Sequence, residues 1–190
     1  MGSKLWIGLP MASSILTRPV TIEEFRKIPD PPGFSIELRN GEVVQLSPPK
    51  NKHAKIQMRI FRLLDARLAS GGFLGMEVAF QPHGNFEFRV ADVVFISQSR
   101  FDAIDDEDNL HGSPELVVEV LSPSNTVAEM YENEALCLGN GALEFWVVDP
   151  ATRQVRVASR VGPTRSYGAG DLIPLESFSA EPLPAAEIFA

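Results

Sequence analysis

An acid inside an apolar strand is the feature that most constrains how this chain can fold. Residues 116–121 form a short run of Leu and Val, bounded by Pro114 and Pro123, and such a run is typical of a strand that is covered on both faces. Glu119 interrupts this run. A buried carboxylate costs several kcal/mol unless it is paired or bound to a cation. The fold must therefore bring a partner to Glu119.

A second predicted strand, over residues 86–96, carries Asp92 directly before another apolar run. Two such strands can bring the carboxylates of Asp92 and Glu119 to a common point. Hard divalent cations such as Mg²⁺ prefer oxygen ligands of this kind and usually keep several waters. The alternative is that Asp92 caps or turns the chain, while Glu119 pairs with an arginine such as Arg89. The pattern alone leaves both interpretations open.

The segment 51–69 has the clearest helical pattern. Its apolar residues recur at helical spacing and form one core-facing stripe, namely Ile56, Ile60, Leu63, Leu64 and Leu68. Four basic residues at i, i+3, i+7 and i+10 share a neighbouring face, namely Lys52, Lys55, Arg59 and Arg62. A solvated helix face is the default explanation, and a basic ridge that binds phosphates is the functional one. His53 and Gln57, at i and i+4, share a third edge of the helix.

Shorter elements are predicted along the rest of the chain. Thr21 and Glu24 form a capping box, which opens a short helix that ends at Pro29. The dipeptide Asn40-Gly41 between alternating runs is a strong signal for a β-hairpin. We also predict strands over 73–81, 144–148 and 154–159, a helix over 127–138, an acidic loop over 97–112, and a loop followed by a short strand over 166–172. Together these elements predict an α/β (α+β) domain with helices on a mixed β-sheet.

Length and composition limit the classes of protein to which the chain can belong. We expect residues 1–18 to be a leader or disordered tail, and residues 19–190 to form one domain. No apolar run approaches the length of a membrane span. The single cysteine, Cys137, excludes an internal disulfide framework, and we expect a cytoplasmic protein. A net charge of −8 argues against tight non-specific binding to DNA, but it does not exclude a local basic surface.

Three strings in this order resemble a known family: RVADVVFI at 89–96, ELVVEVLSPS at 115–124 and GALEFWVVDP at 141–150. They are similar to the Uma2 family (DUF820), a group of mostly bacterial proteins placed with the PD-(D/E)xK restriction-endonuclease-like fold. The resemblance extends from about Thr21 to the C-terminus. It implies a mixed sheet flanked by helices, with β-hairpins near both ends. Such folds often form homodimers, although nothing in this sequence requires one.

The resemblance also implies a chemistry. In this fold two acids hold Mg²⁺ or Mn²⁺, which activates a water and stabilises charge on the scissile phosphate of DNA, while a lysine assists. On this chain Asp92 and Glu119 match the metal ligands. A histidine recurs near the start of the first long helix in the family, which implies that His53, with Gln57, faces the catalytic site. The basic ridge of Lys52, Lys55, Arg59 and Arg62 would contact the nucleic acid.

The chain departs from the family at its lysine. The fold's general motif would place a lysine at Leu121, and Uma2-like sequences commonly move it to the following helix. Counting back from the glycine at 141, that position holds Asn133, the usual tyrosine falls on Cys137, and the acid one turn before the lysine falls on Glu129. Ala91 replaces a proline, which is a milder change. A neutral asparagine cannot place a positive charge near the attacking water.

Two functional hypotheses follow from this departure. The first is a metal-dependent endonuclease in which Lys55 or Lys52 reaches across from the basic helix to replace the lost lysine. The second is a catalytically inactive relative that binds nucleic acid or a protein. The second gains weight from Glu132 and Glu134, whose charges would oppose an incoming phosphate. A lysine ammonium within about 5 Å of the Asp92 and Glu119 carboxylates would favour the first.

Overall fold

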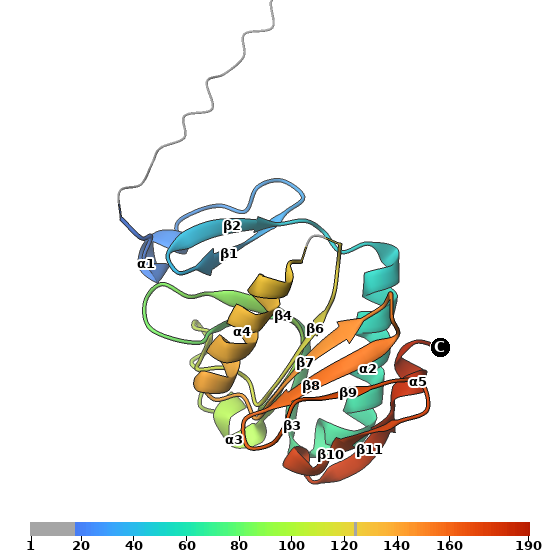
Figure 1. Ribbon diagram of the computed structural model, residues 1–190. Coiled ribbons are helices and arrows are strands. Elements are labelled where there is room, and N and C mark those ends of the chain that lie inside the picture. The colour runs from blue at the N-terminus through green and yellow to red at the C-terminus, as the bar shows by residue number, and fades with distance from the viewer. Residues whose placement is uncertain (1–17, 124) are drawn as a thin grey trace, which may run out of the picture.

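The computed structural model describes residues 18–123 and 125–190, so the predicted leader lies outside the described residues except for Arg18. A seven-stranded mixed sheet forms the centre, in the order β5-β3-β4-β6-β7-β8-β9 (Figure 1). Its strands are β3 (Gly72–Gln81), β4 (Arg89–Ser97), β5 (Leu110–His111), β6 (Leu116–Val120), β7 (Glu144–Asp149), β8 (Gln154–Ser159) and β9 (Arg165–Tyr167). The β6–β7 and β3–β5 pairs are parallel, and the others are antiparallel.

Two long helices cover the two faces of this sheet (Figure 1). The helix α2 (Asn51–Leu68) buries Ile56, Ile60, Leu64 and Leu68 against one face, as its apolar stripe predicts. The helix α4 (Val127–Gly139) places Cys137 against the other face, with Val117 and Phe145. Three helices of four residues complete the set, namely α1 (Ile22–Phe25), α3 (Gln98–Phe101) and α5 (Ala185–Ile188), together with 3₁₀ turns at Ala69–Gly71 and Glu176–Phe178.

A β-hairpin lies near each end of the described chain, and the first was predicted residue by residue. In the first, β1 (Ser35–Arg39) and β2 (Glu42–Leu46) are joined by Asn40 and Gly41, both with positive φ, as a type I′ turn requires. A side chain at Gly41 would collide with Pro19, since a Cβ there would lie 2.3 Å from the proline Cβ. Leu38 bridges to Phe88, which docks this hairpin beside the start of β4 (Figure 1). The second hairpin pairs β10 (Leu172–Leu175) with β11 (Ala180–Pro184).

Most of the predicted elements are confirmed, with local differences. The capping box of Thr21 and Glu24 is present at α1. The strand predicted from residue 86 begins at Arg89, because the preceding Phe88 bridges to the hairpin instead. The prediction of a loop from residue 166 was wrong, because residues 165–167 form the short edge strand β9. This strand forms because it pairs with β8. The predicted loop over 97–112 contains α3 and β5.

In the described part of the chain, no helix is both long enough and apolar enough to cross a membrane. The helix α2 is the longest one, and its basic and polar residues account for this result.

Candidate active site

Asp92 and Glu119 meet where two strands of the sheet stop pairing. The last paired residues of β4 and β6 are Val93 and Val118. The next position in the same antiparallel register places Asp92 opposite Glu119, although the ladder has ended there. Asp92 Oδ2 accepts a hydrogen bond of 2.6 Å from the backbone N–H of Val120, a donor that the shortened ladder leaves free. The Asp92 carboxylate therefore closes the edge of β6 beside Glu119.

The ladder between β3 and β4 is interrupted at the same level. Pairing skips Glu77 and Asp92, and Glu77 has a φ of 53°, a conformation that costs a non-glycine residue about 1–3 kcal/mol. Gln57 of α2 fills the gap: its Nε2 donates to the Asp92 carbonyl at 2.8 Å and to Glu77 Oε1 at 2.5 Å. Met76 and Val78, which would share a face in a regular strand, pack on opposite sides of the sheet.

His53 holds the Asp92 side chain from the same helix. Its Nε2 lies 2.8 Å from Asp92 Oδ1, and both side chains are largely buried. The hydrogen bond to Asp92 raises the pKa of His53, and burial opposes the shift. His53 Nδ1 is buried and has no hydrogen-bond partner among the described residues. In the neutral ring the proton is therefore on Nε2, from which it is donated to Asp92. His53 and Gln57 thus meet at Asp92.

Glu119 is held from the opposite face of the sheet. Asn133 Nδ2 of α4 donates a hydrogen bond of 3.1 Å to Glu119 Oε1. Burial raises the pKa of Glu119 well above its usual value, and the negative charges of Asp92 and Glu37 raise it further. The positive charge of Arg39 and the Asn133 hydrogen bond act in the other direction. The Asp92 carboxylate is therefore close enough to Glu119 for its charge to oppose the ionisation of Glu119.

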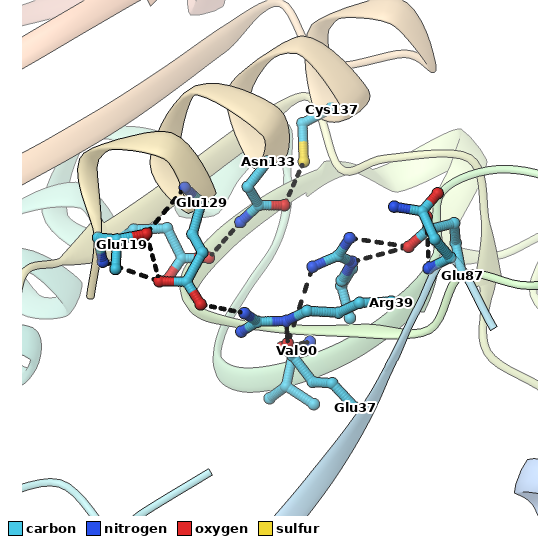
Figure 2. Close-up of polar contacts among 11 residues, drawn as sticks. Glu37, Arg39, Glu87, Val90, Glu119, Glu129, Asn133 and Cys137 are labelled. Atoms are coloured by element: carbon cyan, nitrogen blue, oxygen red, sulfur yellow. Dashed lines mark hydrogen bonds and ion pairs between the residues drawn. The ribbon is translucent and has the colours of Figure 1, made fainter. Parts of the chain in front are cut away.

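Arg39 of β1 brings a cation to this site from the docked hairpin (Figure 2). Its Nε lies 2.8 Å from Glu37 Oε2, and its Nη1 lies 3.2 Å from Glu129 Oε1. Glu37 is buried, and its other oxygen accepts from the backbone N–H of Val90 at 2.8 Å. The guanidinium thus joins the hairpin to the first turn of α4, on the Glu119 side of the sheet. Arg39 was not predicted from the sequence.

The alternative, that Glu119 pairs with an arginine such as Arg89, is wrong in the residue it names, since the arginine whose charge acts on Glu119 is Arg39. Arg89 forms its ion pair with Glu87, at 2.8 Å, because both side chains lie where the hairpin meets β4. Asp92 also lies within a continuous β4 and turns no chain. The expectation that Glu134 would oppose a phosphate is corrected as well, since Glu134 forms an ion pair with Arg156 of β8.

The basic ridge of α2 faces another part of the molecule. Lys52 Nζ donates to the Pro150 carbonyl at 3.1 Å, and Lys52, Lys55 and Arg59 line a pocket beside the β7–β8 turn. Arg62 is exposed one turn further along and does not line that pocket. Among residues 18–123 and 125–190, no lysine has a hydrogen bond or ion pair with Asp92 or Glu119.

The donor set fits a hard divalent cation that keeps most of its waters. Within the described ranges, no group of three His, Cys, Asp or Glu side chains is arranged to hold a metal. Two neighbouring carboxylates remain, Asp92 and Glu119, and Mg²⁺ is usually bound by one or two carboxylates together with waters and substrate phosphates. Burial raises the pKa of Glu119 most, and the negative charge of Asp92 raises it further; a cation at this site would offset the second effect.

The sequence did not single out Glu77 or Arg39 as site residues. Glu77 lies inside a strand pattern, and no local residue signals its positive φ. Arg39 directly precedes the Asn40-Gly41 turn and looks like an ordinary exposed turn residue. Its partner Glu129 is 90 residues away in the chain, so only the docking of the hairpin reveals the contact.

The fold is that of a nuclease-like protein. The structure is similar to the crystal structure of "a putative nuclease belonging to DUF820" from Anabaena variabilis, with a TM-score of 0.77 and 23% sequence identity over 90% of this chain and 98% of that chain. The family model Uma2, described as "Putative restriction endonuclease", matches residues 22–183. The chain belongs to the Uma2 family. No curated protein matches the sequence.

Proposed function

We propose that this protein is a metal-dependent endonuclease that hydrolyses phosphodiester bonds in DNA, as the PD-(D/E)xK assignment of its family implies. The observation that carries the proposal is the convergence of Asp92 and Glu119 at the end of the β4–β6 ladder. Mg²⁺ or Mn²⁺ held by these two carboxylates would stabilise charge on the scissile phosphate and lower the pKa of a bound water. The family match and the shared fold support the same class of reaction.

The chain's own side chains position the two carboxylates. His53 and Gln57 hold Asp92 through its side chain and its carbonyl. Asn133 holds Glu119 from α4. Each carboxylate is thus oriented by a side chain that a helix holds in place. Supporting groups of this kind usually preorganise metal ligands, and here they would preorganise the two carboxylates for the cation.

Arg39 takes the electrostatic role of the missing lysine in this proposal. It is the cation whose charge lowers the pKa of Glu119, and its side chain is about one-fifth exposed, which leaves it open to a ligand. A guanidinium also presents several donors in a fixed plane, which suits a phosphate better than an asparagine amide does. Glu37 and Glu129 would fix its orientation.

A second candidate function is a nucleic-acid- or protein-binding module without catalysis. One specific observation favours it: the position that carries the lysine in similar sequences holds Asn133, a neutral amide, directly against Glu119. In this case the protein would keep the structure of the site, including the two carboxylates, but would not hydrolyse DNA.

The decisive experiment compares the wild type with Asp92→Asn on plasmid and linear DNA in Mn²⁺. Asn keeps an oxygen that can accept from Val120, so the variant is expected to fold, which melting curves check. Asp106→Asn, in the exposed acidic loop, is the matched control. The nuclease proposal requires cleavage by the wild type and the control, and loss of cleavage in Asp92→Asn. Equal nicking by all three proteins, or by none, ends it.

A further inference from the structure

A basic pocket lies on a different face of α2 from the one that holds Asp92. It has a volume of about 220 Å³ and lies between α2, the turn after β7 and the end of the chain at α5. Four cationic side chains line it, namely Lys52, Lys55, Arg59 and Arg153, and Phe189 provides an aromatic wall. The volume is below the roughly 300–1,000 Å³ of pockets for drug-sized molecules. The pocket therefore suits a small anion rather than a whole cofactor.

The positive charge of this pocket is only partly offset by the protein. In the described part of the chain, none of its four cations forms an ion pair with a carboxylate, whereas many other basic residues do, namely Arg18, Arg26, Lys27, Arg39, Arg89, Arg100 and Arg156. The nearby Asp149 accepts hydrogen bonds within its own turn from Ala151 and Thr152, and its charge interacts with that of Lys52 without a direct ion pair. The chain has a net charge of −8, yet this pocket gathers four cations of which none has a carboxylate ion-pair partner among the described residues.

Two of these cations are fixed in place by the backbone. Lys52 donates to the carbonyl of Pro150 at 3.1 Å, and Arg153 donates to the carbonyl of Phe189 at 3.2 Å, with its guanidinium 5.9 Å from the centre of the Phe189 ring. Arg153 itself has a φ of 55°, so the turn aims it toward the C-terminal segment at some backbone cost. Carbonyl partners orient a cation without cancelling its charge, which leaves it available to an anion.

We propose that this pocket binds a phosphate group of the nucleic-acid strand that enters the Asp92–Glu119 site. The inference rests on the proposed function and deepens it. The helix α2 presents His53 and Gln57 to Asp92 from one face, and Lys52, Lys55 and Arg59 to the pocket from another. A phosphate held in the pocket therefore sets the position of the strand relative to the two carboxylates. It is either a terminal phosphate or an internal phosphodiester.

The test separates binding from cleavage. We would measure binding of fluorescently labelled single strands and duplexes by anisotropy in EDTA, across a range of salt, for the wild type and the double variant Lys55→Gln/Arg153→Gln. The expected result is at least tenfold weaker binding at low salt, with a salt slope that is smaller by about 1 for the lost phosphate contact. The control Arg160→Gln/Arg165→Gln removes the same charge from exposed residues elsewhere and should bind within about twofold of the wild type.

The two sources of the phosphate are separated by comparing strands with 5′-phosphate, 3′-phosphate and hydroxyl ends. A terminal site gives a preference for one phosphorylated end, which the double variant loses, whereas an internal site gives equal weakening for all strands. Both outcomes support the pocket. Equal binding by the wild type and the double variant overturns it, as does a matching loss in the control or no binding by the wild type. If binding behaves as expected but no protein cleaves in Mn²⁺, the nuclease proposal fails and the pocket stands.

Discussion

Asn133 donates a hydrogen bond of 3.1 Å to Glu119, and Cys137 lies one turn behind it, with its Sγ 3.6 Å from the Asn133 side-chain oxygen. The position on α4 where the family resemblance implies a lysine thus faces the buried acid, but it supplies an amide instead of an ammonium group. The positive charge near Glu119 comes instead from Arg39, on the hairpin that docks beside α4. The effect of adding a positive charge at position 133 can therefore be tested separately from the effect of removing the charge of Arg39.

Asn133→Lys is expected to raise cleavage of DNA in Mn²⁺ by about tenfold or more, a change of roughly 1.4 kcal/mol in the barrier. An ammonium beside Glu119 favours its charged form and stabilises charge on an attacking water. The measurement is the initial rate of plasmid nicking. The matched control is Asn133→Met, which is also long but uncharged and should not increase the rate. A lysine variant that folds, binds DNA and cleaves no faster would contradict the electrostatic argument.

Glu119→Gln is expected to abolish cleavage and to stabilise the metal-free protein by about 1 kcal/mol, or roughly 2–4 °C in melting temperature for a domain of this size. Burial and Asp92 both disfavour the charged carboxylate, whereas a glutamine can still accept from Asn133. The measurement is a thermal melt in EDTA at pH 7.

The control for this variant is Glu115→Gln, which should show the opposite sign. Glu115 directly precedes β6, accepts a hydrogen bond from Ser97 Oγ at 2.6 Å and forms an ion pair with Arg100 at 3.0 Å. Removing its charge should lower the melting temperature. If both variants destabilise the protein equally, Glu119 is not held in the strained electrostatic state that the structure shows.

Much of the fold follows from local patterns. The Asn40-Gly41 turn, the apolar stripe of α2 and the capping box at Thr21 each depend on neighbouring residues, and each is present. The strand of Asp92 and the strand of Glu119 were also predicted from their apolar runs. Their side-by-side placement needs one further assumption, that the two strands are neighbours, which the β4–β6 pairing satisfies.

The rest of the site depends on contacts that no local pattern encodes. Arg39 reaches Glu129 only because the first hairpin docks over the end of the sheet. Glu77 contacts Gln57 only because the pairing between β3 and β4 is interrupted at the level of Asp92. Lys55 lies on the predicted basic face of α2, but the β7–β8 turn, which comes nearly 100 residues later, makes that face a pocket. Tertiary docking decides each of these contacts.

Arg39→Gln is expected to reduce cleavage at least tenfold and to destabilise the protein by about 2 kcal/mol. The cost arises because Glu37 is buried and would keep only the Val90 N–H and Arg89, whose Nη1 lies 4.0 Å away; partial exposure of Arg39 moderates it. Arg39→Lys should recover part of the activity, since lysine keeps the positive charge but cannot bind Glu37 and Glu129 at the same time, as the guanidinium does. The measurements are nicking rates and urea unfolding.

Arg100→Gln controls for lost stability alone. Arg100 also pairs with a largely buried glutamate, Glu115, but this pair lies away from Asp92 and Glu119. A similar loss of stability with unchanged cleavage in Arg100→Gln assigns the activity loss in Arg39→Gln to the site. A parallel loss of cleavage in both variants would show that stability alone controls the rate.

Cys137 is expected to be unreactive in the folded protein. Burial raises the pKa of its thiol from 9.0 to about 12, and the thiolate is the form that reacts. At pH 8 a thiol-specific reagent should label the unfolded protein rapidly and the native protein only at the rate of unfolding. Rapid labelling of native protein at pH 8 would contradict the burial of this side chain.

The same shift predicts how stability depends on pH. Because the folded protein keeps the thiol proton to a higher pH than the unfolded chain does, the stabilisation is complete below about pH 9 and is lost as pH rises toward 12. The slope from this one group approaches about 1.4 kcal/mol per pH unit within that window. Other groups titrate there too, so the measurement is the difference in unfolding free energy between wild type and Cys137→Ser at pH 8, 9 and 10. That difference should shrink as pH rises above 9, and a constant difference would show that the thiol keeps an ordinary pKa.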